Sequence, residues 1–129
     1  MTREEFEEAV MRSIELLPEE FKSQLENTSV IVEDYPTQAQ RKRMGLKDSQ
    51  TLLGLYEGVP LTKQHSISFT NPDRITIFQK PIENECRYLG VNVQDEITRV
   101  VKHEIAHHFG ISDERLDEIE KRPRGYRKE

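Results

Sequence analysis

Two histidines, one glutamate and one aspartate near the end of the sequence have the types and the spacing that metal chemistry requires. They lie in the segment HEIAHHFGISD, residues 103–113. A helix turns by about 100° per residue, so His103 and His107 would lie one turn apart on one face and could share an ion. Imidazole nitrogens suit zinc, which prefers four tetrahedral ligands. The pair therefore predicts a zinc site that needs further ligands.

The residues after the histidine pair can complete such a site. Gly110 can adopt a left-handed conformation, which would let the chain turn back after the helix. Asp113 could then bring its carboxylate to the same ion, leaving the fourth position to water, as in a catalytic site. Glu104 follows the first ligand. It could take a proton from that water, whose pKa the metal lowers toward 7, during attack on a polarised carbonyl.

Other interpretations of these side chains stay open. The two histidines and Glu104 could be ordinary polar residues on an exposed helix face. Asp113 could cap a final helix together with Ser112. His108 projects nearer the apolar stripe of the helix and is interpreted as a core or hydrogen-bonding histidine rather than a ligand. His65 is interpreted as a surface residue of a loop.

The helix that carries the motif has clear ends and a clear apolar face. Asn92 with Asp95 predicts its start near residue 93, and Gly110 predicts its end after residue 109. An apolar residue recurs every four positions and predicts the buried stripe: Ile97, Val101, Ile105 and Phe109. A different sector holds Val100, His103, Glu104 and His107. A ligand pair beside a packed stripe would be held rigidly.

The rest of the chain predicts a single α+β domain with a small sheet. Thr2 and Glu5 form a capping-box pattern for a first helix, whose core positions are Phe6, Val10, Ile14 and Leu17. Pro18 begins a second short helix that should end near Asn27. Further expected elements are strands at 29–33, 52–56 and 74–78, and helices at 36–44, 81–90 and from 112 or 113 through 119. Residues 61–71 are expected to form a loop, and 122–129 a basic tail beyond a domain of residues 1–121.

Composition excludes several classes of protein. A chain of 129 residues with 34% hydrophobic and 33% charged residues has room for one domain and contains no run long enough to span a membrane. The acidic start MTREEFEEAV does not resemble a secretory signal, and the single cysteine, Cys86, predicts a reducing, cytoplasmic location. Nineteen basic residues against twenty-four acidic ones give a net charge of -5, so no nucleic-acid partner is expected.

The motif and two other blocks resemble a known family. HEIAHHFGISD fits HExxH extended to HExxHxxGxxD, and LLGLYEGVPLT with NPDRITIFQKPIE fills most of residues 52–83. Together they are similar to the minimal zincin-like metallopeptidases of bacteria. The resemblance implies a small zincin-like fold, with His103, His107 and Asp113 as zinc ligands, Glu104 as base and a peptide or protein substrate. It also implies that the strand near 74–78 offers its edge to an extended substrate.

Comparison with better understood zincins separates the functional hypotheses. Metzincins have a third histidine in place of Asp113 and a downstream methionine turn, whereas methionines occur here only at positions 1, 11 and 44. Tyr56 could donate to a reaction oxyanion, although strand packing is the favoured interpretation. The leading hypothesis is a zinc-dependent metallopeptidase. The alternatives are a binding module with a structural or vestigial zinc, and a metal-dependent ribonuclease, which Asp113, Glu104 and the net charge disfavour.

Overall fold

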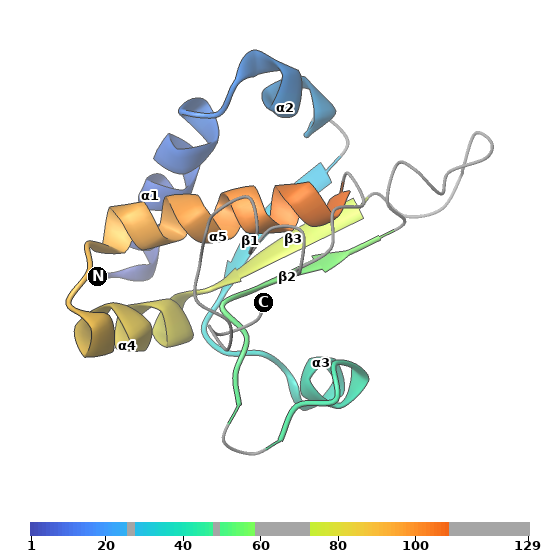
Figure 1. The fold of residues 1–129 in the computed structure, drawn as a ribbon, viewed down its shortest axis with the longest axis vertical. Helices are drawn as coiled ribbons and strands as arrows, with labels where there is room; N and C mark the ends of the chain where they lie inside the picture. Colours follow the sequence, from blue (N-terminus) through green and yellow to red (C-terminus); the bar gives the residue numbers. More distant parts are fainter. Residues whose placement is uncertain (26–27, 48–49, 59–72, 109–129) are drawn as a thin grey trace.

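The sheet at the centre of the molecule combines a parallel and an antiparallel strand pair (Figure 1). The structure, a computed structural model, describes residues 1–25, 28–47, 50–58 and 73–108. Its strands are β1 (Thr28–Glu33), β2 (Gly54–Glu57) and β3 (Asp73–Phe78), in the order β1-β3-β2. β1 is parallel to β3, and β2 is antiparallel to it, with Gly54 opposite Ile77.

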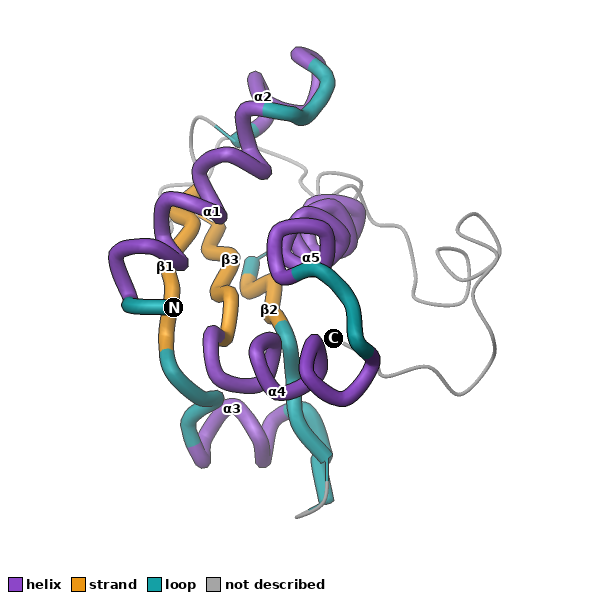
Figure 2. Tube along the Cα trace, turned by 90° about the vertical axis from the view of Figure 1, so that its left-hand side faces the viewer, coloured by secondary structure: helices purple, strands orange, loops and turns teal. Residues whose placement is uncertain are grey.

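The described helices pack around this sheet, and one of them contacts most of the other elements. They are α1 (Arg3–Glu15), α2 (Glu19–Gln24), α3 (Gln38–Arg43), α4 (Gln79–Leu89) and α5 (Val93–His108). α5 contacts β2 and β3 and also packs against α1 and α4 (Figures 1 and 2). α3 lies at the opposite end of the molecule from α2. None of the described helices has the length and apolar character needed to cross a lipid bilayer.

Alternation along the strands divides the apolar side chains between two clusters. Ile75 and Ile77 of β3 join the main cluster, which also contains residues of α1, α4 and α5. The main cluster includes Phe6, Val10, Val32, Ile82, Ile97, Val100, Val101 and Ile105. Phe78 and Leu55 point to the other face of the sheet and form a smaller cluster with Leu52. The sheet therefore has apolar contacts on both of its faces.

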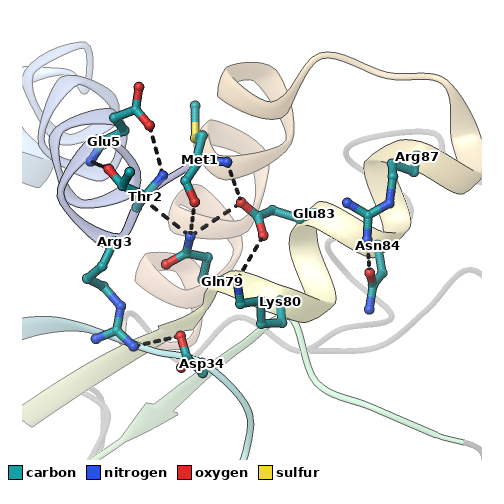
Figure 3. Close-up of polar contacts among 10 residues, drawn as sticks. All are labelled: Met1, Thr2, Arg3, Glu5, Asp34, Gln79, Lys80, Glu83, Asn84 and Arg87. Atoms are coloured by element: carbon teal, nitrogen blue, oxygen red, sulfur yellow. Dashed lines mark hydrogen bonds and ion pairs between the residues drawn. The ribbon is translucent and has the colours of Figure 1, made fainter.

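Side-chain caps define the start of the first and last described helices. Thr2 Oγ1 accepts from the Glu5 amide at 3.0 Å, and Glu5 Oε1 accepts from the Thr2 amide at 2.8 Å, so the predicted capping box is confirmed (Figure 3). Asn92 Oδ1 accepts from the Asp95 amide at 3.1 Å, as the sequence predicts for the start of α5. These contacts satisfy amide groups that lack partners within the helix.

The beginning of α1 is also tied to α4 (Figure 3). Gln79 Nε2 donates to the Met1 carbonyl at 3.0 Å, and the Met1 amino group lies 3.3 Å from Glu83 Oε2. Arg3 reaches in another direction and pairs with Asp34 at 2.7 Å, just beyond β1. Side chains of α4 and of the residue after β1 therefore contact the beginning of α1.

The predicted elements are confirmed within the described residues, with four shifts of two or three residues at their ends. α3 begins at Gln38 rather than at Pro36. α2 ends at Gln24 rather than near Asn27. β2 begins at Gly54, because Leu52 and Leu53 precede the paired segment as buried core residues. α4 begins two residues before Pro81, and a proline is tolerated in a first turn because its missing N–H would have no partner there. The 61–71 loop, the final helix and the basic tail lie outside the described residues.

One expectation about the sheet is wrong. The strand at 74–78 was expected to offer an edge to a substrate, but β3 lies between β1 and β2 and pairs with both of them. Residues 74–77 of β3 face Glu57–Gly54 on one side and Ser29–Val32 on the other. The backbone of β3 is therefore already engaged along this length, and no substrate strand can add to it there.

Candidate metal centre

The last turns of α5 bring two imidazoles and a carboxylate together. One candidate ligand atom from each of His103, Glu104 and His107 lies within 4.8 Å of the others. The two imidazole rings meet edge to face, with centroids 4.8 Å apart and planes at 71°. His103 is 4% exposed, and the His107 side chain is 21% exposed. The one-turn spacing therefore produces the neighbouring pair that the sequence predicts.

Glu104 is the most deeply buried member of the group. It has no solvent exposure, and its Oε1 lies 3.4 Å from His107 Nδ1. That contact lacks hydrogen-bond geometry, and neither carboxylate oxygen has a hydrogen-bond partner among the described residues. Burying a carboxylate without such partners is costly unless a positive charge lies beside it. A cation held by the imidazoles would provide that charge, so the donor set fits a metal such as zinc.

The burial of these side chains follows from the way α5 packs. Ile97, Val101 and Ile105 form the predicted stripe and are each at most 3% exposed. The neighbouring sector of α5 also faces protein, because β2 runs against it and Val100 is fully buried. The interpretation of His103 and Glu104 as solvated surface residues is therefore wrong, whereas His107 is partly buried.

The side chains of the remaining predicted site residues lie outside the part of the chain that the structure describes. Asp113, Gly110 and Ser112 lie outside the described residues, so the third protein ligand remains a prediction. Phe109 and His65 also lie outside them. His108 is the last residue of α5, but its side chain is outside the description.

Tyr56 faces the same side of the sheet as Gly54 and packs against the main core cluster. Its hydroxyl donates to Asp73 Oδ2 at 2.9 Å, at the adjoining ends of β2 and β3. Burial and then this hydrogen bond raise the pKa of Tyr56, so the phenol stays protonated. The favoured interpretation of Tyr56 as a strand-packing residue is confirmed.

Sequence reasoning missed one residue that touches the site. Gly54 of β2 is buried against α5 at Val100 and Glu104. A signal was present, because a glycine inside a strand of bulky residues often marks a place where another element comes close. The sequence alone gave no indication of which element that would be.

The fold and the site together define a class of protein. A small α+β domain carries a HExxH segment on a buried helix beside its sheet, which is the arrangement of a zincin-type metal centre. The chain belongs to the zincin-like metallopeptidase family, whose family model matches residues 25–122.

A solved structure supports the fold. A protein from Thermo thermophilus, described as "Conserved hypothetical protein (TTHA0227)", is similar over 95% of this chain and 100% of its own, with a TM-score of 0.55. At 24% sequence identity this likeness concerns the fold alone. Among curated proteins, none matches the chain significantly.

Proposed function

We propose that this protein is a zinc-dependent metallohydrolase that cleaves peptide bonds, with Glu104 as general base and His103, His107 and Asp113 as zinc ligands. The observation that carries the proposal is the buried Glu104 carboxylate, 3.4 Å from His107 on the helix that also presents His103. Membership of the zincin-like metallopeptidase family supports the reaction class. Asp113 enters through its place in the HExxHxxGxxD spacing.

Each described side chain has a distinct task in this proposal. His103 and His107 would hold the ion through ring nitrogens, and the burial of His103 keeps its ring in place. Zinc, when bound, would polarise the substrate carbonyl and lower the pKa of a water molecule toward neutrality. Glu104 would accept the proton of the attacking water on a carboxylate oxygen and pass it to the leaving amine. Its dry surroundings strengthen the interaction of the carboxylate with nearby charge.

The deciding experiment separates metal binding from proton transfer. Glu104→Gln keeps the shape of the side chain and removes the base, so the variant should retain stoichiometric zinc and lose about 10²- to 10⁴-fold in kcat on a cleavable peptide. His103→Ala and Asp113→Ala should lose zinc, measured by elemental analysis. Asp95→Asn, an exposed change in the first turn of the same helix, is the control and should behave as wild type.

Two results would overturn parts of this assignment. Equal peptide turnover by the wild type and Glu104→Gln would exclude Glu104 as the base. Stoichiometric zinc without hydrolysis of any member of a broad peptide library would instead support a binding module with a structural zinc.

A further inference from the structure

β2 comes close to α5 at Gly54. A Cβ placed on Gly54 would lie 2.8 Å from Val100 Cγ1, 3.1 Å from Glu104 Cγ and 3.4 Å from the Thr76 carbonyl oxygen. The first of these distances is too short for any real contact, and the second is tight. The missing side chain at position 54 is therefore what allows strand and helix to meet here.

Space, rather than backbone conformation, accounts for the glycine. The described glycines with positive φ are Gly45 and Gly90, and Gly54 is not among them. Its backbone belongs to an ordinary antiparallel pair, opposite Ile77. An alanine could adopt this conformation, so the effect of a substitution would come from the atoms that the new methyl group meets.

The methyl group would press first on Val100 and then on Glu104, and neither histidine is among its three nearest neighbours. The three atoms nearest to the added Cβ belong to Val100, Glu104 and Thr76. Among the described residues, no hydrogen bond holds either oxygen of the Glu104 carboxylate. The place of the carboxylate therefore depends on packing around its methylene groups and on the adjacent His107 imidazole, and β2 forms one wall of that packing.

We propose that Gly54 is a positioning residue, which lets β2 support the Glu104 side chain at the place where the base must act. The catalytic part of this inference rests on the proposed function. The part that concerns the position of the Glu104 side chain does not. A misplacement well under 1 Å is enough to weaken proton transfer, because catalytic groups must be held within about 0.5 Å of their productive geometry.

The test compares two alanine substitutions on the same strand. Gly54→Ala should keep stoichiometric zinc and lower kcat by about tenfold or more, with KM changed by less than about twofold. Leu55→Ala is the matched control, because Leu55 packs on the opposite face of the sheet and does not belong to the main cluster. It should lower the melting temperature and leave kcat near that of the wild type.

A second variant guards against simple misfolding. Gly54→Ala combined with Val100→Ala removes the shortest contact and keeps the one with Glu104. The double variant should recover stability relative to Gly54→Ala and still show a reduced kcat. Full recovery of kcat would overturn the proposal, because the effect would then act through Val100 and helix packing. An equal loss of kcat in Leu55→Ala would also overturn it.

A structural measurement keeps the inference testable if the wild type cleaves no peptide. In a crystal structure of Gly54→Ala, the Glu104 carboxylate should be displaced relative to both imidazoles. In a crystal structure of Leu55→Ala, it should stay in place. An unmoved Glu104 in Gly54→Ala would overturn the inference. Absence of hydrolysis in the wild type, with Glu104 displaced as expected, would overturn the proposed function alone.

Discussion

Cys86 shows how burial decides the chemistry of a single side chain in this protein. It is 5% exposed on α4 and belongs to the main core cluster. Burial, followed by the negative charges of Glu96 and Glu85, raises the pKa of the Cys86 thiol to about 11. The neutral thiol is therefore favoured at physiological pH, and the interpretation of Cys86 as an inert buried residue is supported.

A thiol reagent measures this effect directly. At pH 8 Cys86 should react at least about two orders of magnitude more slowly in the native protein than in denaturant, because both the thiolate fraction and access are reduced. The unfolded thiol ionises at lower pH than the folded one, so the stabilisation from keeping it neutral is present below about pH 8.5. It declines as pH rises toward 11. Similar reaction rates in the native and the denatured protein would contradict the assignment of Cys86 as a buried, neutral thiol.

At the scale of elements, Glu57 joins β2 to its neighbours. Its carboxylate lies 2.8 Å from Arg43, at the end of α3, and 3.0 Å from Arg74 on β3. The pair with Arg74 joins two neighbouring strands, whereas the contact with Arg43 depends on where α3 packs. Burial opposes ionisation of Glu57, but the hydrogen bond and charge of Arg74 and the charge of Arg43 outweigh it, so the pKa of Glu57 is lowered.

Glu57→Gln should therefore destabilise the protein most near neutral pH. The pKa of Glu57 is lower in the folded protein than in the unfolded chain, where it is about 4.3. The ionised carboxylate therefore stabilises the folded state at pH values above about 4.3, and this stabilisation is lost as the pH falls through the folded pKa. We expect a loss of about 1 kcal/mol at pH 7 from urea unfolding, and convergence with the wild type in acid. Asp34→Asn, which breaks the exposed Arg3 pair, is the control and should change stability little. If the difference in unfolding free energy between wild type and Glu57→Gln stayed constant with pH, the ion pairs of Glu57 could not be its cause.

At the scale of the molecule, the candidate metal centre and the main core share one helix. α5 packs against α1, α4, β2 and β3 while it carries His103, Glu104 and His107. An ion that binds only the folded arrangement of these side chains must stabilise the whole domain. Metal binding and global unfolding are therefore expected to be linked.

Addition of zinc to metal-free protein should raise the melting temperature. At a free zinc concentration 100 times the dissociation constant, binding should raise the free energy of unfolding by about 2.7 kcal/mol. For a domain of this size this corresponds to an increase in melting temperature of about 5–15 °C. His103→Ala should abolish the shift in a thermal melt followed by circular dichroism. An undiminished shift in that variant would place the ion elsewhere.

Local signals in the sequence predicted the parts of the fold that depend on neighbouring residues. Thr2 with Glu5 and Asn92 with Asp95 give the helix starts, because a cap needs only residues three positions apart. The histidine pair follows from the helical repeat in the same way. The glycine after α4 also ends that helix as expected, with a φ of 69° at Gly90.

Features that depend on distant pairing could not be predicted in this way. The central place of β3 arises because β1 and β2 both pair with it, and no local pattern specifies strand order. The role of Gly54 likewise requires knowing that α5 crosses β2 at Glu104. The family resemblance supplied a predicted ligand set, His103, His107 and Asp113, but not these contacts.

The parallel pairing of β1 with β3 has a consequence for how the protein is made. Thr28 pairs with Asp73, and Ala9 of α1 receives a hydrogen bond from Gln94 of α5, 85 positions later. In the folded protein the apolar face of α1 packs against α5, which is the last of the described elements along the chain. Contacts between residues far apart in the sequence slow folding, and slow folding prolongs the time during which apolar surface is open to aggregation. We therefore expect a chain truncated before α5 to expose the apolar face of α1 and to aggregate more readily than the full chain.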